Sequence, residues 1–293
     1  MKRLFVALLC LISTSVSASP KYYLSICAIF RNEDRFLKEW IEYHRMMGAE
    51  HFYLFNHLSE DNYLEVLKPY VQEGIVDLIE WPFEPKSELD WQKNIQGAAY
   101  NKILNENGND NVWIAFIDTD EFITLSFEKS LPLFLSEFEE FGGIVMNWQL
   151  FGTSNVKRIP DDRTLIGTLT RKAPFNHELN LYIKSIVQSR AVSKFVSVHH
   201  PRYHTPFFPV NEHKVHLNPH ETSPYLSIDN IRLNHYYYRD EDFFTEVKVP
   251  RLSKNRGAIS PMPNPEYNET EDLIMLTHVP ELERRLFSQG SAH

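Results

Sequence analysis

The chain has 293 residues, a length that supports one large α/β domain or two smaller ones with a substantial core. Hydrophobic residues make up 43% and charged residues 24% of the sequence, which is typical of a folded globular protein. The formal net charge of −9 argues against broad nucleic-acid binding, because phosphate neutralisation requires clustered lysines and arginines. A bound divalent cation still allows such a chain to bind a diphosphate.

The first 18 residues have the pattern of an export signal. Lys2 and Arg3 precede an apolar run that is too short to span a bilayer, which takes roughly 20 residues. Small residues lead up to Ala18, so we expect cleavage after it. This predicts an exported protein without a stable transmembrane anchor, lumenal (Golgi or ER) in a eukaryote and extracytoplasmic or secreted in a bacterium. Cys27 is then the only cysteine of the mature chain, which rules out a cysteine metal site.

Short apolar runs alternate with amphipathic stretches in the first half of the chain. Buried strands are predicted at residues 22–30, 51–55, 75–80, 112–117 and 143–148, with helices at residues 34–47, 59–70, 91–107 and 130–141. Gly48 and Gly74 stand where left-handed residues end helices. The alternation predicts an α/β fold with a mainly parallel sheet and helices on both faces. In such a sheet, ligands bind beyond the carboxyl ends of the strands.

The pattern is weaker in the second half. Strands are predicted at residues 163–170, 181–188 and 191–198, a loop at 257–272 and a closing helix at 273–287. We therefore expect a signal at residues 1–18, one main domain at 21–257, and a loop and helix at 258–293 that pack on the same domain.

The strongest functional feature is an acidic segment directly after the apolar strand at residues 112–117. It contains Asp118, Asp120 and Glu121, and carboxylates this close repel one another unless a cation is present. Oxygen ligands suit Mg²⁺ or Mn²⁺, which bridge to phosphate oxygens and help a nucleoside diphosphate to leave. A solvated acidic turn is the alternative, and the position at a strand end favours the metal site.

Polar residues also follow the first two strands. After the first strand, Arg31 is predicted to contact phosphate and Glu33 a ribose hydroxyl or base edge, with Asn32 between them. Asn56 ends the second strand and is predicted to lie at the same edge. A helix-capping cluster around Asn32 is an equally good explanation. Lys93 is a further possible phosphate contact, and a solvated first helical turn is the alternative for it.

The order of these motifs resembles that of the family 92 glycosyltransferases and of related bacterial family-2-like transferases. The matching segments extend from about residue 23 to residue 257 and include residues 31–33, 39–44, 52–56, 113–122, 147–148, 184–187 and 234–236. Lys254, Arg256 and Gly257 match the closing motif of the family only loosely. The resemblance implies a fold of the GT-A (nucleotide-diphospho-sugar transferase) type, a UDP-sugar donor and Mn²⁺ (or Mg²⁺).

The resemblance also implies roles for three residues. Asp118 would contact the ribose or the metal, Asp120 would bind the metal, and His235 would complete the coordination. A histidine packed among the tyrosines that follow it is the alternative for His235. Because Asp120 is placed at a strand end, Asp120→Ala is predicted to abolish turnover and to leave the fold largely intact.

The implied reaction moves a galactose-like hexose to a glycan or glycolipid acceptor, with inversion and with help from a general base. Glu178, His199 and His200 are the candidates for this base, because they lie in the second half of the chain, where acceptors bind. Two other functions stay open. One is a metal-dependent phosphoester hydrolase that uses the same acidic edge. The other is a catalytically inactive carbohydrate-binding relative, suggested by the aromatic content of 13%.

Overall fold

The computed structural model describes residues 19–127, 130–218 and 220–287, so the predicted export signal lies outside the described residues. The strands are β1 (Tyr22–Phe30), β2 (His51–Asn56), β3 (Val76–Glu80), β4 (Asn111–Phe116), β5 (Glu121–Leu125), β6 (Gly143–Leu150), β7 (Arg171–Lys172), β8 (Ile183–Gln188), β9 (Val192–Phe195), β10 (Pro201–Tyr203), β11 (Pro209–Val210), β12 (Ile231–His235) and β13 (Thr270–Glu271). The α-helices are α1 (Asp34–Met46), α2 (Tyr63–Gln72), α3 (Glu88–Asp90), α4 (Gly97–Asn107), α5 (Leu131–Ser136), α6 (Leu165–Thr168), α7 (Glu241–Phe243), α8 (Val249–Arg256) and α9 (Val279–Phe287). Two π-helical turns, η1 (Trp91–Gln96) and η5 (Phe244–Lys248), lead into α4 and α8.

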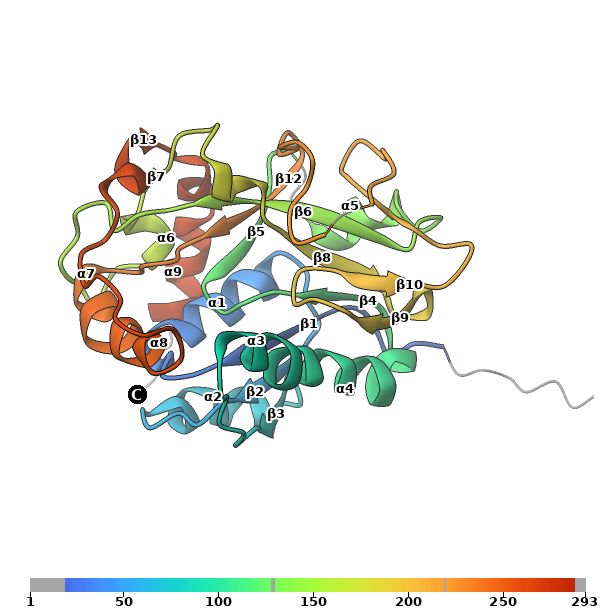
Figure 1. Ribbon diagram of the computed structural model, residues 1–293, viewed down its shortest axis with the longest axis horizontal. Helices are drawn as coiled ribbons and strands as arrows, with labels where there is room; N and C mark the ends of the chain where they lie inside the picture. The colour runs from blue at the N-terminus through green and yellow to red at the C-terminus, as the bar shows by residue number, and fades with distance from the viewer. Residues whose placement is uncertain (1–18, 128–129, 219, 288–293) are drawn as a thin grey trace, which may run out of the picture.

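Within these ranges, nine strands form one large sheet (Figure 1). The order is β3-β2-β1-β4-β8-β6-β12-β5, and β11 pairs with β6. Strands β1 to β4 are mutually parallel, as are β6 and β12, whereas β8 runs antiparallel to β4 and β6 and β5 antiparallel to β12. The predicted fold class, an α/β fold with a mainly parallel sheet, is confirmed.

Both faces of the sheet are covered by hydrophobic clusters. Successive side chains of a strand point to opposite faces, so each central strand contributes to both clusters. On β1, Ile26 and Ala28 belong to the larger hydrophobic cluster, which includes α1. Their neighbours Cys27 and Ile29 belong to the second cluster, which α4 covers. The near-continuous apolar sequence of β1 is therefore the expected pattern for a parallel strand buried on both faces.

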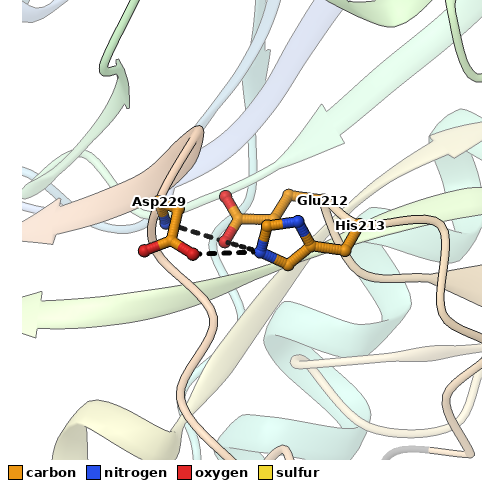
Figure 2. A group of neighbouring side chains, drawn as sticks. All are labelled: Glu212, His213 and Asp229. Carbon is orange, nitrogen blue, oxygen red and sulfur yellow. Dashed lines mark hydrogen bonds and ion pairs between the residues drawn. The ribbon is translucent and has the colours of Figure 1, made fainter.

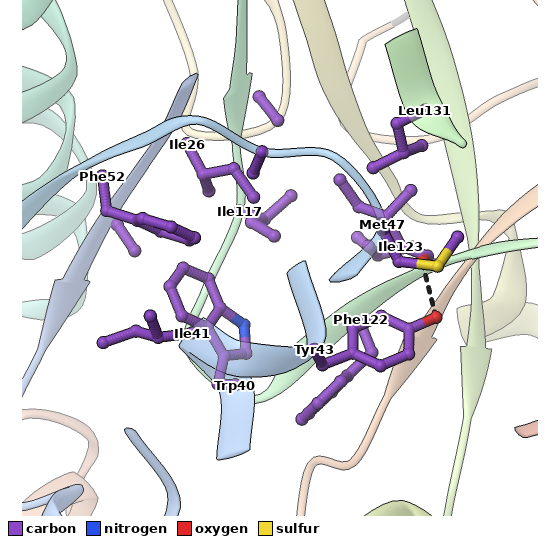
Figure 3. Close-up of a cluster of buried hydrophobic side chains, with 14 of the residues drawn as sticks. Ile26, Trp40, Ile41, Tyr43, Met47, Phe52, Ile117, Phe122, Ile123 and Leu131 are labelled. Carbon is purple, nitrogen blue, oxygen red and sulfur yellow. Dashed lines mark hydrogen bonds between the residues drawn. The ribbon is translucent and has the colours of Figure 1, made fainter. Parts of the chain in front are cut away.

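Helix α1 is anchored to the strand that follows the acidic segment (Figure 3). The indole N–H of Trp40 donates to the carbonyl of Glu121 at 2.7 Å, and the hydroxyl of Tyr43 donates to the carbonyl of Ile123 at 2.9 Å. The backbone N–H of Ile123 donates to Nε2 of His44 at 3.2 Å. Burial lowers the pKa of His44 to about 3, so this imidazole is a neutral acceptor. Apolar packing and three hydrogen bonds thus fix β5 against α1.

Several predicted elements are confirmed with small shifts of their ends. Gly48 and Gly74 have φ of 103° and 70° after α1 and α2, as predicted for left-handed residues that end helices. The strand predicted at residues 163–170 is wrong. Helix α6 forms there instead, because Thr164 Oγ1 accepts the N–H of Gly167 and the carboxylate of Glu39 accepts two further N–H groups at the helix start.

The C-terminal part contains more regular structure than the sequence suggests. The predicted helix at residues 273–287 is a 3₁₀ turn, η7 (Ile274–Thr277), followed by α9, which packs against α1. Strands β5 and β12 and the α7–η5–α8 segment were not predicted. None of the described helices is long and apolar enough to cross a bilayer.

Candidate active site

A cavity of about 1120 Å³ lies at the carboxyl ends of the parallel strands. Glu33 after β1, Asp118 after β4, Trp148 in β6 and His235 at the end of β12 line it. The opposite wall comes from η1, α8 and the segment 259–265. The cavity therefore lies where the strand pattern predicts a ligand.

The acidic segment forms a tight turn between β4 and β5. The N–H of Glu121 donates to the carbonyl of Asp118 at 3.1 Å, and the N–H of Tyr236 donates to the carbonyl of Asp120 at 2.9 Å. His235 is paired with Glu121 in the ladder between β12 and β5. This pairing brings a residue 115 positions away from Asp120 beside it, a contact that the family resemblance implied.

The two oxygens of Asp118 are both held by neighbouring side chains. The amide of Gln96 donates to Oδ1 at 2.6 Å, and the ammonium of Lys184 donates to Oδ2 at 2.9 Å. Lys184 is 1% exposed. Burial acts to lower the pKa of Lys184, but Asp118 and Glu121 outweigh this effect and raise it. Lys184 is therefore a charged group inside the protein, and Asp118 has a fixed orientation at the cavity wall.

Asp120 has its own cationic partner. The ammonium of Lys248 donates to Oδ2 at 2.6 Å, and Nε2 of His235 lies 3.4 Å from Oδ1. Burial acts to raise the pKa of Asp120, and the charge of Lys248, with His235 close by, holds it well below its ordinary value. Asp120 is 7% exposed, so it is a buried, paired carboxylate. This changes the expectation that its replacement by alanine would leave the fold intact.

The residues present fit a divalent ion at one edge of Asp120. Two adjacent ligands of an octahedral ion with bonds of about 2.1 Å are roughly 3 Å apart. The separation of 3.4 Å between Asp120 Oδ1 and His235 Nε2 is close to this value. Asp118, the third predicted ligand, turns both oxygens to Gln96 and Lys184. Asp120 and His235 therefore lie close enough together to share an ion, and Asp118 is held beside Asp120 by other partners.

Glu121 holds the turn from the protein interior, on the side away from the cavity. It is fully buried, and its Oε2 accepts the N–H of Asp118 at 2.7 Å. Burial raises the pKa of Glu121 well above its ordinary value; Lys184 opposes this shift, and the charge of Asp118 adds to it. Glu121 is not among the residues that line the cavity. It therefore positions Asp118 and does not face a ligand.

Glu33 is the centre of a second set of ion pairs. Its Oε2 lies 2.9 Å from Nη2 of Arg239, and its Oε1 lies 3.5 Å from Nη1 of Arg251. Nη2 of Arg239 also donates to the carbonyl of Thr119 at 2.6 Å, and Nη1 of Arg251 donates to the carbonyl of Arg31 at 2.7 Å. Glu33 and Arg31 both line the cavity. Because both oxygens of Glu33 have arginine partners, its main role is to join β1, the acidic turn and α8.

The structure does not place the two predicted asparagines at the cavity. Asn32 has φ of 56° and accepts the N–H of Glu60 on Oδ1 at 2.8 Å. Asn56 accepts the N–H of Ser59 at 3.0 Å and donates to Glu80 at 2.7 Å. Both side chains therefore tie together the loops that follow the strands. Asn32 does not cap α1, because Glu33 occupies the N-cap position and no side chain caps the helix there.

Lys93 is exposed on η1 and does not line the cavity, although Gln92 and Gln96 of the same turn do.

Among the three candidates for the general base, His199 lines the cavity, whereas Glu178 is exposed and His200 lines a separate cavity of about 330 Å³. The ring of His199 lies near those of Trp148 and Tyr182, with centroids 5.7 and 5.4 Å apart.

Residues that the sequence reasoning missed come from the two π-helical turns. The last residue of η1, Gln96, contacts Asp118, and the last residue of η5, Lys248, contacts Asp120. π-helical turns often occur at functional sites, where the extra residue reorients a side chain. A buried lysine between valines at positions 247 and 249 was the available signal for Lys248.

A second acidic group lies outside the cavity (Figure 2). Glu212, His213 and Asp229 have possible metal-binding atoms close together, and Nε2 of His213 is 3.1 Å from Oδ2 of Asp229. The carboxylate of Glu212, however, accepts N–H groups of Asp229, Asn230 and Ile231 at 2.6 to 2.7 Å. Its oxygens are therefore engaged in holding the loop that leads into β12.

Comparison with known proteins places the chain among the glycosyltransferases. A glycosyltransferase family 92 protein of Ricinus communis is 27% identical over 239 residues, covering 78% of this chain and 38% of that protein. One of Oryza sativa subsp. japonica is 26% identical, covering 78% of this chain and 36% of that protein. The chain thus spans less than two fifths of the length of these relatives.

Among solved structures, that of S. aureus TarS 1-349 in complex with UDP-GlcNAc aligns with a TM-score of 0.41 and 13% identity. The alignment covers 91% of this chain and 73% of the TarS chain. The model of glycosyltransferase family 92 matches residues 21–271, and the chain belongs to this family.

Proposed function

We propose that the chain transfers a galactose-like hexose from a UDP-sugar to a glycan or glycolipid acceptor, with inversion and with Mn²⁺ or Mg²⁺. The observation that carries the proposal is the turn of Asp118 and Asp120 beside His235, in a cavity large enough for a nucleotide sugar, in a member of family 92. A divalent ion held by Asp120 and His235 would neutralise charge on the departing diphosphate. Lys184 and Lys248 add positive charge beside Asp118 and Asp120, respectively.

Nucleotide binding is tested by thermal unfolding with UDP, in the presence and absence of Mn²⁺. A ligand that binds only the folded state stabilises it by about 2.7 kcal/mol at a concentration of 100 times its Kd. We expect millimolar UDP to raise the Tm, and to raise it further with Mn²⁺. ADP and uridine are the matched controls for the base and the diphosphate. The absence of a shift with any nucleotide, with or without metal, would contradict the proposal.

We further propose that His199 is the general base. Its Nδ1 contacts the carbonyl of Ile183 at 2.9 Å, which assigns the proton to Nδ1 and leaves Nε2 as the basic nitrogen. Burial, with the charge of Lys184 adding to it, lowers the pKa of His199 to about 4. The imidazole is therefore neutral at neutral pH. The rings of Trp148 and Tyr182 beside it offer a surface on which an acceptor sugar can pack.

We expect His199→Gln to lower kcat by about 10²- to 10⁴-fold, the usual contribution of a positioned base, with a smaller change in the KM of the donor. The matched control is His200→Gln, because the neighbouring histidine lines the separate cavity. In the wild type the acid limb of kcat/KM, which reports the pKa of the free enzyme, is expected near pH 4, well below the value of about 6.5 for a free histidine. Equal kcat values for the two variants would contradict this role.

A further inference from the structure

We propose that Lys248 is the counter-ion of Asp120 in the metal-free protein, and that a divalent ion binds by displacing its ammonium group toward the nucleotide diphosphate. Metal and nucleotide would then bind cooperatively, with Lys248 as the coupling group. The proposal rests on the proposed function. It assigns to Lys248, the residue just before α8, the coupling of metal binding to nucleotide binding.

The contacts of Lys248 show that its position is built into the fold. The side chain is 4% exposed, and Nζ is 2.6 Å from Oδ2 of Asp120. Nζ also donates to the carbonyl of Tyr237 and lies 4.0 Å from the centroid of its ring. A carboxylate, a carbonyl and an aromatic face thus converge on one ammonium group, which is the arrangement of a cation site.

The backbone holds Lys248 in this position. It is the last residue of the π-helical turn η5, and α8 continues directly from it. Arg251, three residues later, donates to the carbonyl of Arg31, which attaches α8 to the loop after β1. Lys248 therefore reaches Asp120 from a segment that is anchored one helical turn later, and only its flexible side chain has to move.

A metal ion and this ammonium compete for the same carboxylate. An ion at Oδ1 of Asp120 and Nε2 of His235 brings two positive charges next to the charge of Lys248, in a buried place where repulsion is poorly screened. A diphosphate in the cavity offers the ammonium another anionic partner. Bound nucleotide therefore reduces the repulsion between Lys248 and the ion, which increases metal affinity. Because such coupling is reciprocal, bound metal also increases nucleotide affinity.

The test is a Mn²⁺ titration followed by the electron paramagnetic resonance signal of free Mn²⁺, with and without UDP. We expect Lys248→Gln to bind Mn²⁺ alone more tightly than the wild type, on the order of tenfold. We also expect UDP to increase Mn²⁺ affinity less in this variant than in the wild type. The matched control is Lys68→Gln, which removes an exposed positive charge on α2, outside the cavity. It should titrate like the wild type, because the partners of Asp120 are Lys248 and His235.

Equal or weaker Mn²⁺ binding by Lys248→Gln would overturn the inference and leave the proposed function standing if the wild type binds Mn²⁺ with UDP. A wild type that binds neither Mn²⁺ nor UDP would overturn the proposed function itself. Circular dichroism checks folding of the variant. If Lys248→Gln does not fold without metal, Lys248→Arg gives the complementary measurement. It keeps the charge, so tight binding of Mn²⁺ alone by this variant would contradict the inference.

Discussion

Replacement of Asp120 by asparagine is expected to lower kcat for sugar transfer by at least about 100-fold. Loss of an outer-shell partner of a metal site costs up to about 100-fold, and a direct ligand, the role proposed for Asp120, should cost at least as much. The physical reason is the loss of the negative charge shared by Lys248 and the proposed metal. The measurement is kcat with a UDP-sugar donor at saturating Mn²⁺. Asp162→Asn, an exposed aspartate outside the cavity, is the matched control.

The alanine variant of Asp120 should also lose stability. Removing one partner of a buried ion pair costs about 3–5 kcal/mol, because it leaves the other charge buried and uncompensated. Asp120→Ala leaves Lys248 in that state. The double variant Asp120→Asn with Lys248→Gln should recover part of the free energy of unfolding without recovering turnover. A folded Asp120→Ala enzyme with full activity would overturn the assignment of this site.

Most of the first half of the fold is predictable from the sequence because β1, β2 and β4 are almost wholly buried. Strands such as β1 and β4 then form continuous apolar runs, and helices between them carry one apolar face. The position of the acidic turn is predictable for the same reason, because the apolar run of β4 is followed directly by carboxylates. An apolar run and the first polar residues after it can be recognised without tertiary information.

The second half was less predictable because its buried strands contain polar residues. Strand β12 carries Arg232, Asn234 and His235, and all three are buried. Arg232 is compensated by Asp272, 40 residues later, at 2.8 Å. A period-2 pattern of apolar residues cannot reveal a strand whose polar side chains find their partners far along the chain.

The partners of the acidic turn were harder to derive from the sequence, for a related reason. Gln96 and Lys248 reach Asp118 and Asp120 through two π-helical turns, and neither turn has a sequence signature. Lys184 is more visible, since a lysine inside an apolar strand signals a buried charge with a partner. The same reasoning applied to all apolar segments would have pointed to Lys248 as well.

Apart from the ion pair of Asp120 and Lys248, Arg239 is the residue whose replacement is expected to lower stability most. It is fully buried, and its Nη2 holds both Glu33 and the carbonyl of Thr119. Arg239→Met keeps the apolar length against Phe36, whose ring lies 4.7 Å from the guanidinium carbon, and removes only the charge and the donors. Glu33 is then left with Arg251 at 3.5 Å, and Thr119 loses this donor.

We expect Arg239→Met to lower the free energy of unfolding by about 3–5 kcal/mol, which corresponds to a Tm decrease of roughly 10 °C. The measurement is thermal unfolding by circular dichroism. Arg284→Met is the matched control, because its pair with Glu281 is exposed and such pairs contribute about 0–1 kcal/mol. Equal melting of the two variants would show that the buried pair does not hold β1 to the acidic turn. A loss of UDP affinity in folded Arg239→Met, below its lowered Tm, would show that this pair also sets the geometry of Asp118 and Asp120, the residues on either side of Thr119.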